Sequence, residues 1–229
     1  MSGIVGSRLN NRGSGVVGKL GTDGQVLTSS GAGVSAVYES ISAGGDLSFG
    51  GDTFGANKVI GSNDAYTLSL ETNGNTAMTI DTNGHITQPL QPAFVVSPSA
   101  NSADISADTT HTITANTEIL DRNGDWDGTN TFTAPVTGMY MLSGTVGVYD
   151  FDHDNNYSAL FVLTSNRRWT PMFSLNNAFG VDGTYFFAFG VAADMDASDT
   201  AVFQFRNDQG SQQPWIAQEY TFFSGYLLG

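Results

Sequence analysis

Apolar and polar residues alternate with a period of two through residues 92–229. Runs such as AFVVS at 93–97 and TAVFQFRN at 200–207 place their apolar side chains on one face of an extended strand. Gly, Asn and Asp separate these runs at intervals of roughly 8 to 14 residues, the spacing of turns between antiparallel strands. No run follows the period of an amphipathic helix. The pattern therefore predicts an all-β fold, an antiparallel sandwich or barrel in a single domain.

Residues 59–91 carry a second, shorter alternating pattern around two Asn-Gly pairs, at 73–74 and 83–84. Asn-Gly between alternating runs favours tight hairpin turns, because both residues tolerate positive φ. The predicted strands are short and have one apolar face. We therefore expect a β-meander stalk that packs against copies of itself about a threefold axis. The alternating apolar residues are Tyr66, Leu68, Leu70, Met78 and Ile80.

Residues 1–58 are rich in Gly, Ser, Ala and Thr, with one short alternating run, QVLTS, at 25–29. This composition cannot bury enough apolar surface to fold alone, but it can lie extended along a partner. A flexible linker is one interpretation, and an extended attachment arm is the one we favour. Pro89 and Pro92 mark the next boundary. The sequence thus predicts an arm at 1–58, a stalk at 59–91 and a head at 92–229.

The charge balance narrows the range of partners. The 229 residues include 8 Lys and Arg against 22 Asp and Glu, for a formal net charge of −14. Binding to nucleic acid or to an anionic membrane surface requires an excess of basic residues, so neither is expected. The chain has no cysteine, which excludes disulfides and thiolate metal sites.

The sequence contains no apolar run long enough to cross a bilayer, so membrane insertion is not expected. The first twenty residues also lack the apolar core of a secretory signal peptide. We therefore expect synthesis in a cytoplasm without signal-directed export.

The stretch NGDWDGTNTFTAPVTGMYML at 123–142 resembles the signature of the complement globular-head domain, a jelly-roll family shared with tumour necrosis factor. That signature is an aromatic-Asp pair, a phenylalanine and then Gly-x-Tyr. The opening Pro-Ala-Phe at 92–94 and the closing FFSGYLL at 222–228 also resemble this family. The matching signature residues are Trp126, Asp127, Phe132, Gly138, Tyr140, Phe223, Gly225 and Leu228.

Two features depart from the family pattern. Trp126 lies one residue nearer Phe132 than the family's aromatic does, and Met141-Leu142 replace the usual aromatic pair. The resemblance implies a ten-strand antiparallel jelly roll that forms homotrimers. The signature residues themselves are expected to specify packing, not chemistry.

The segments at 21–33 and 73–87 resemble segments of bacteriophage tail-fibre and appendage proteins. This resemblance implies a trimeric fibre or spike on the virion surface, attached to another virion protein through residues 1–58. Its head would adhere to a host-surface glycan or protein. Two alternatives stay open: a capsid head decoration or cement protein built on the same trimer, and a secreted complement-like lectin.

We expect no enzymatic activity. His85, His111 and His153 lie in no metal-binding or nucleophile motif, and no cysteine is available as a nucleophile. A Ser-His-Asp arrangement can nevertheless assemble from residues that are distant in sequence.

Calcium is the candidate cofactor. Asp150, Asp152, Asp154 and Asn156 alternate along one loop, and hard oxygen ligands of this kind suit calcium. An EF-hand is excluded, because Asn155 and Phe161 occupy the positions where it needs glycine and an acidic residue. The alternative is a solvated acidic turn, since such turns favour Asp and Asn. The same two interpretations apply to a second acidic run, with Asp194, Asp196 and Asp199.

Arg167, Arg168 and Trp169 form the candidate ligand-binding group, in a loop-like run, SNRRWTP. Two of the eight basic residues adjoin an aromatic ring there, which suits stacking on a sugar or binding a carboxylate. The alternative is a partly buried anchor at the end of a strand.

Overall fold

The computed structural model describes residues 25–28, 37–40, 55–57, 59–153, 156–175, 180–208 and 213–228. The chain divides into two compact units, residues 1–60 and 61–229. In the first unit, β1 (Gln25–Thr28) pairs antiparallel with β2 (Val37–Ser40), which confirms a strand at QVLT. The rest of the predicted arm, apart from residues 55–57, lies outside the described residues, so its attachment role stays a prediction.

The second unit begins with a three-stranded antiparallel sheet, which we call the stalk sheet. Asn73 and Gly74 join its first two strands with positive φ values of 50° and 73°, which confirms the hairpin predicted there. At the second turn, the Asp81 carboxylate accepts hydrogen bonds from the backbone N–H groups of Asn83 and His85, at 2.8 and 2.9 Å. The strands are β3 (Leu68–Thr72), β4 (Asn75–Ile80) and β5 (Ile86–Thr87).

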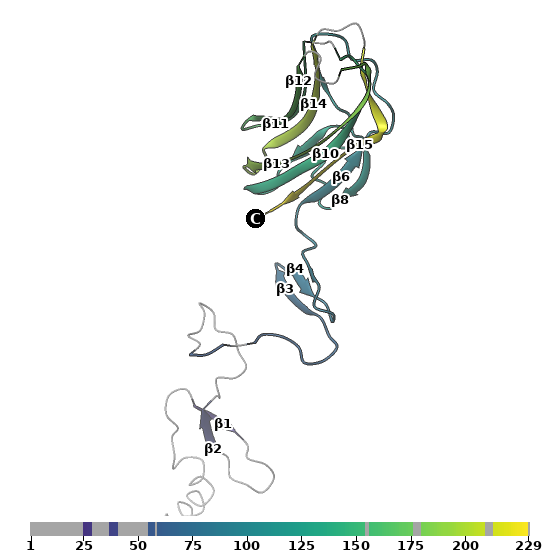
Figure 1. The fold of residues 1–229 in the computed structure, drawn as a ribbon. Coiled ribbons are helices and arrows are strands. Elements are labelled where there is room, and N and C mark those ends of the chain that lie inside the picture. The colour runs from purple at the N-terminus through teal and green to yellow at the C-terminus, as the bar shows by residue number, and fades with distance from the viewer. Residues whose placement is uncertain are drawn as a thin grey trace, which may run out of the picture. The chain divides into compact units, whose positions relative to one another are not determined.

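Ten strands in the described part of residues 92–228 form the head domain, which is built from two sheets (Figure 1). Sheet I has the order β13-β10-β15-β6-β8, and sheet II has the order β12-β11-β14-β7, with β9 also paired to β14. The strands are β6 (Ala93–Ser97), β7 (Thr109–Thr112), β8 (Thr117–Asp121), β9 (Thr131–Thr133), β10 (Gly138–Phe151), β11 (Tyr157–Thr164), β12 (Arg168–Leu175), β13 (Gly183–Met195), β14 (Thr200–Asp208) and β15 (Trp215–Leu227).

The connectivity is that of a jelly roll. From β10 onward the chain passes from sheet I to sheet II for β11 and β12, returns for β13, crosses again for β14 and ends in sheet I. The last strand, β15, lies between β10 and β6, the first strand of the head. Every pairing is antiparallel. This order confirms the predicted ten-strand, all-β jelly-roll sandwich.

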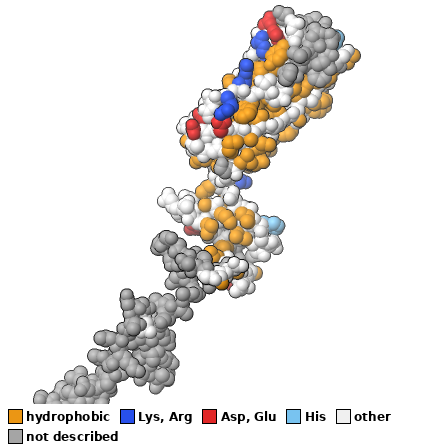
Figure 2. Space-filling view, turned by 60° about the vertical axis from the view of Figure 1, so that its left-hand side comes forward, with side chains coloured by type: hydrophobic (Ala, Val, Ile, Leu, Met, Phe, Trp, Pro, Cys, Tyr) orange, Lys and Arg blue, Asp and Glu red, His pale blue; other side chains and the backbone are white. Residues whose placement is uncertain are grey.

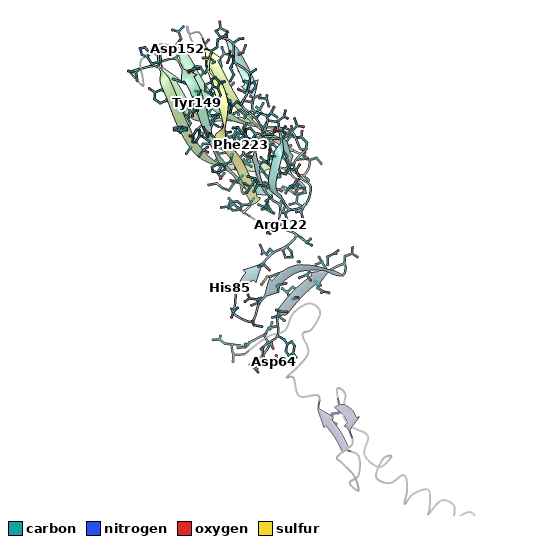
Figure 3. All side chains as sticks on the ribbon, turned by 90° about the vertical axis from the view of Figure 1, so that its right-hand side faces the viewer. Asp64, His85, Arg122, Tyr149, Asp152 and Phe223 are labelled. Carbon is teal, nitrogen blue, oxygen red and sulfur yellow. The ribbon has the colours of Figure 1, made fainter. Side chains whose placement is uncertain are left out.

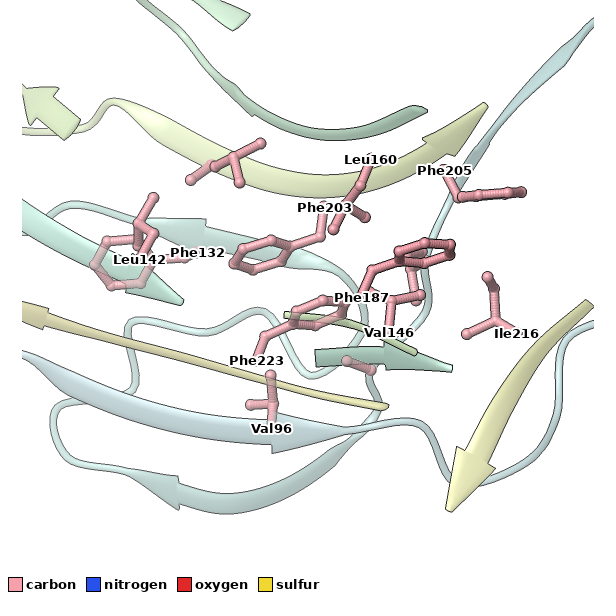
Figure 4. Packing of buried hydrophobic residues seen from close by; sticks show 14 of the residues in the cluster. Val96, Phe132, Leu142, Val146, Leu160, Phe187, Phe203, Phe205, Ile216 and Phe223 are labelled. Atoms are coloured by element: carbon pink, nitrogen blue, oxygen red, sulfur yellow. The ribbon is translucent and has the colours of Figure 1, made fainter. Parts of the chain in front are cut away.

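The core lies between the two sheets and combines aromatic with aliphatic side chains (Figure 4). Phe203 from sheet II stacks on Phe223 from sheet I, with ring centroids 4.0 Å apart and planes 4° from parallel. Their alternation with outward-facing neighbours follows the period of two that the sequence carries. Burial of these large side chains is the main stabilising contribution to the head.

One expectation was wrong. Arg168 and Trp169 are not in a loop, because they begin strand β12. This strand forms the edge of sheet II, and its register shifts between the pairs Leu160–Met172 and Val162–Trp169. Pro171 lies within the shift, where no ladder hydrogen bond from its nitrogen is required. An edge position and a register shift therefore allow this strand to contain a proline.

Two side chains of the head bind the segment that leads from the stalk sheet into β6. Arg122 donates a hydrogen bond to the carbonyl of Gln88 at 3.0 Å, and Asn123 donates one to the carbonyl of Leu90 at 3.1 Å (Figure 3). Whether the stalk forms a domain separate from the head, as the boundary at 91 and 92 predicts, stays a prediction. The described residues contain no helix with the length and apolar character needed to cross a membrane.

Candidate functional site

The signature residues of the head pack into its core. Phe94 stacks between Trp126 and Phe132, with ring centroids 5.2 and 4.8 Å away. The Trp126 indole donates a hydrogen bond to the carbonyl of Ala115 at 3.1 Å, and the Tyr140 hydroxyl donates one to that of Val136 at 2.7 Å. Burial raises the pKa of Tyr140 above its ordinary value. These groups are satisfied within the protein and hold the fold together.

Asp127 shapes the turn before β9. One oxygen of its carboxylate accepts hydrogen bonds from the backbone N–H groups of Thr129, Asn130 and Thr131, at 2.8 to 3.0 Å. Burial acts to raise the pKa of Asp127, but these backbone donors outweigh it and lower the pKa. The remaining signature residues are also structural. Gly138 begins β10, Phe223 and Gly225 are buried in β15, and Leu228 donates its backbone N–H to the Met139 carbonyl.

The strongest candidate for a functional surface is the side of sheet I that faces away from the core. Alternation along β13, β10 and β15 sends one set of side chains into the core and the next set outward. The register aligns the outward sets in rows, one of which is Gly190, Ser143, Ser224 and Val95. The Ser143 and Ser224 hydroxyls lie 2.9 Å apart. Small residues therefore make the middle of this surface flat.

Most of the aromatic side chains lie on one side of that flat centre, and Tyr226 lies on the other. Tyr149 stacks on Trp215 with ring centroids 4.4 Å apart, and Phe186 meets Tyr220 edge to face at 4.8 Å. Phe186 is 57% exposed. Figure 2 shows hydrophobic side chains gathered over one side of the head. We call this surface the aromatic face, and its residues are Tyr149, Phe186, Trp215, Tyr220, Phe222 and Tyr226.

The aromatic face is almost free of charge. No charged residue occurs in 139–149, 186–192 or 220–226, which form most of the three strands that carry it, β10, β13 and β15. Glu219 is an acidic residue beside it, and its carboxylate lies 3.4 Å from the Tyr149 hydroxyl. In a chain of net charge −14, an uncharged and exposed aromatic surface is typical of a contact region.

The candidate ligand-binding group lies on sheet II and makes contacts within the chain. The Arg167 guanidinium pairs with Asp194 at 2.6 Å and lies over the Trp169 ring, 5.6 Å from its centroid. Arg168 lies over Phe161 at 4.5 Å, and Trp169 packs against the core. A bound sugar would have to compete with these contacts. Ligand binding by this group stays a prediction.

The structure describes three of the four predicted calcium ligands, Asp150, Asp152 and Asn156. Asp150 is the penultimate residue of β10 and has a positive φ of 52°, and its carboxylate accepts a hydrogen bond from the Trp215 indole at 3.3 Å. Asp154 lies outside the described residues, and Asn156 is exposed. Asp152 is instead buried (Figure 3). Calcium binding by these four residues stays a prediction.

Asp152 belongs to a group that the sequence did not indicate. Its carboxylate, an imidazole nitrogen of His153 and the Asp182 carboxylate lie within 4.8 Å of one another. The His153 imidazole is 2.6 Å from Asp182, and this hydrogen bond holds the pKa of Asp182 below its ordinary value. A mixed oxygen and nitrogen donor set suits zinc or manganese better than calcium, which takes about six to eight oxygen ligands.

The second acidic run has a structural arrangement. Asp194 pairs with Arg167, and the Asp199 carboxylate accepts the backbone N–H of Asp196 at 2.8 Å. Ser198 completes this turn with a φ of 77°. Asp196 and Asp199 thus lie in a turn, whereas Asp194 lies in β13, and calcium binding by this run stays a prediction.

Two pockets of the described head are modest in size. One, of about 220 Å³, lies between residues 98–103 and His111, whose pKa burial lowers. The other, of about 360 Å³, is open and lies beside Asp125, Pro135 and Ser198. We assign no reaction to either, and the absence of enzymatic activity stays a prediction.

No protein-family model matches the sequence, and no curated protein matches it. Many solved structures are similar, and three serve as examples. The globular domain of zebrafish complement 1qA protein shows 15% identity and a TM-score of 0.43, covering 61% of this chain and 98% of that one. Murine APRIL shows 12% identity and a TM-score of 0.44, covering 60% and 99%. Eiger TNF from S. frugiperda shows 16% identity and a TM-score of 0.40, covering 61% and 93%. The strand order described above, independently of these low similarities, makes the head an antiparallel jelly roll.

Proposed function

We propose that this chain is a structural protein of a bacteriophage virion, in which three copies form a fibre or spike. The arm attaches each copy to another virion protein, and the head is presented to the host surface. The observation that carries the proposal is the exposed, nearly uncharged aromatic face on a strongly acidic chain.

The exposed aromatic side chains of this face are better explained by contact with other copies of the chain than by contact with water. Phe186, Phe222 and Tyr226 are 57%, 43% and 48% exposed, so their burial between copies would remove a large apolar area from water. Copies that each carry a charge of −14 repel one another, and contact is least costly through an uncharged surface. The flat centre at Ser143 and Ser224 allows sheets to approach closely.

The assignment to a phage is supported by the fibre-like segments at 21–33 and 73–87, which precede the head. Such a protein acts by binding, not by catalysis. A trimer presents every weak adhesion site three times, and many trimers on one particle multiply the avidity further. Arg167, Arg168 and Trp169 are the candidate contacts to a glycan or protein.

Two other assignments use the same trimer. A capsid decoration or cement protein would lie on the head of the particle, and a secreted complement-like lectin would belong to no particle. Immunogold electron microscopy of particles that contain the chain separates these cases. We expect label on the tail or its appendages. Label on the capsid would favour a decoration protein. If no particle carried label, both virion assignments would be contradicted.

The trimer is tested by native mass spectrometry of the intact chain. We expect a mass three times the 24.2 kDa of one chain. Tyr220→Glu and Phe222→Glu place a desolvated charge in the contact and should yield folded monomers. Leu163→Glu is the matched control, because Leu163 is 37% exposed but lies on sheet II.

Circular dichroism verifies that each variant retains its β structure. A wild-type monomer would refute the proposal, as would equal dissociation by Leu163→Glu and by the two variants of the aromatic face.

A further inference from the structure

The stalk sheet has an apolar face that is only partly covered in the single chain. The register pairs Leu68 with Ile80 and Ile80 with Ile86, and it pairs Leu70 with Met78. Paired residues point to the same side of a sheet, so these five aliphatic side chains share one face. Leu70 is 56% exposed and Ile86 is 60% exposed. Figure 2 shows hydrophobic side chains clustered on this part of the molecule.

The opposite face is polar. Ser69 pairs with Thr79, and Thr79 pairs with Thr87, with the Ser69 and Thr79 hydroxyls 3.4 Å apart. The stalk sheet is therefore amphipathic, with one face suited to water and the other to burial. Its strands have only 5, 6 and 2 residues, and a sheet of this size requires its apolar face to be covered for stability.

We propose that the apolar stalk face is covered by the same face of the two other copies, so that the stalk folds when the chains assemble. The inference rests on the proposed trimer and adds that the folding of residues 68–87 depends on formation of that trimer. Leu68, Leu70, Met78, Ile80 and Ile86 would form the interior of a three-sided stalk, with Ser69, Thr79 and Thr87 facing water.

The connection to the head favours copies of this chain over any other occupant. Only residues 88–92 separate β5 from β6, and β6 belongs to sheet I, which carries the aromatic face. Five residues span at most about 18 Å. Arg122 and Asn123 hold this connection against the head. Association of three heads therefore brings three stalk sheets together at a high effective concentration.

Charge also favours copies of the same chain. None of the five apolar residues has a charged or strongly hydrogen-bonding side chain. The face therefore has no polar group that would select a different partner. An identical apolar face on each neighbouring copy is a matching occupant. The nearby charged groups, Glu71 and Asp81, lie toward the turns.

Hydrogen-exchange mass spectrometry of residues 68–87 in the intact protein tests the inference. We expect protection in the wild-type trimer and exchange faster by about tenfold or more in the Tyr220→Glu monomer, because an uncovered stalk opens readily. Ile80→Glu should leave the trimer mass unchanged, since the aromatic face is intact, but abolish stalk protection. Thr79→Glu, the adjacent position on the polar face, should retain protection.

The outcomes separate the two proposals. A wild-type monomer refutes the proposed trimer itself. A wild-type trimer with an unprotected stalk overturns only the stalk inference, as does a trimer in which Ile80→Glu and Thr79→Glu exchange alike. Protection in the wild type that is lost in Ile80→Glu and kept in Thr79→Glu supports it.

Discussion

At the scale of single residues, aspartate side chains in this protein mainly build turns. The carboxylates of Asp81, Asp121 and Asp127 each accept two or more backbone hydrogen bonds. Asp125 differs, because one of its carboxylate oxygens is buried without a hydrogen-bond partner. Burial, and then the negative charge of Asp121, raise the pKa of Asp125 above its ordinary value. Its ionised form is therefore disfavoured in the folded chain.

Asp125→Asn should raise the free energy of unfolding at neutral pH by less than about 1 kcal/mol, since the site is partly exposed and screened. A pKa raised by folding costs no stability at pH values where both states are protonated. The cost develops as the pH rises from the unfolded value, 3.8, through the folded value. Urea denaturation at several pH values should therefore show a higher free energy of unfolding for the variant than for wild type at pH 7. In acid this difference should disappear.

Asp127→Asn is the control for Asp125→Asn, because folding lowers the pKa of Asp127. Its ionised form is favoured in the folded chain, so the variant should be less stable than wild type at neutral pH. If both variants changed the free energy of unfolding with the same sign, the opposite pKa shifts of Asp125 and Asp127 would be contradicted.

At the scale of elements, close packing of the strands depends on glycine residues, which have no side chain. A Cβ atom added at Gly225 in β15 would lie 2.4 Å from a Phe94 ring carbon and 2.8 Å from a Leu142 methyl. Phe94 cannot move aside easily, because its ring is buried and stacks on both Trp126 and Phe132. Gly225 is thus a packing requirement at the pairing of β15 with β6 and β10.

Gly225→Ala should lower the free energy of unfolding by about 1–3 kcal/mol, the usual cost of overpacking a core. Chemical denaturation followed by tryptophan fluorescence measures the change. Gly183→Ala in β13 is the matched control, because its nearest neighbour, a Tyr185 ring carbon, is 4.0 Å away. Gly183→Ala should be neutral or slightly stabilising, because alanine restricts the unfolded chain. A cost equal to that of Gly225→Ala would contradict the packing explanation.

At the scale of the whole molecule, apolar contact and charge repulsion oppose each other. Three copies together carry three times a net charge of −14, while the contacts proposed on the aromatic face and the stalk sheet are uncharged. Repulsion between the copies is therefore long-range and sensitive to salt, whereas the attraction is not.

The melting temperature of the trimer at pH 7 should accordingly rise between about 10 mM and 300 mM sodium chloride, as the Debye length falls from about 30 Å to below 8 Å. Differential scanning calorimetry at fixed protein concentration measures it. A fall with added salt would indicate that ion pairs between copies hold the trimer, contrary to the uncharged aromatic face.

Much of the fold was predictable from local patterns. Alternation along the chain predicted the strands, and the Asn73-Gly74 pair predicted the hairpin in the stalk sheet. Trp169 was placed in a loop-like run but lies in β12, where an edge position and a register shift admit Pro171. The same alternation could have predicted the aromatic face, since it places Phe186 and Tyr220 on the side of each strand that faces away from the core.

The sequence by itself determined the all-β class, the strands of the head and which side chains on each strand face the core. Only the tertiary structure decided which strands are neighbours, and so brought Phe186 of β13 against Tyr220 of β15. It likewise placed Asp152 beside Asp182 and turned Asp150 toward Trp215. The physical reason is that the period of two is a property of one extended strand, whereas a surface or a site is made by the register and order of several.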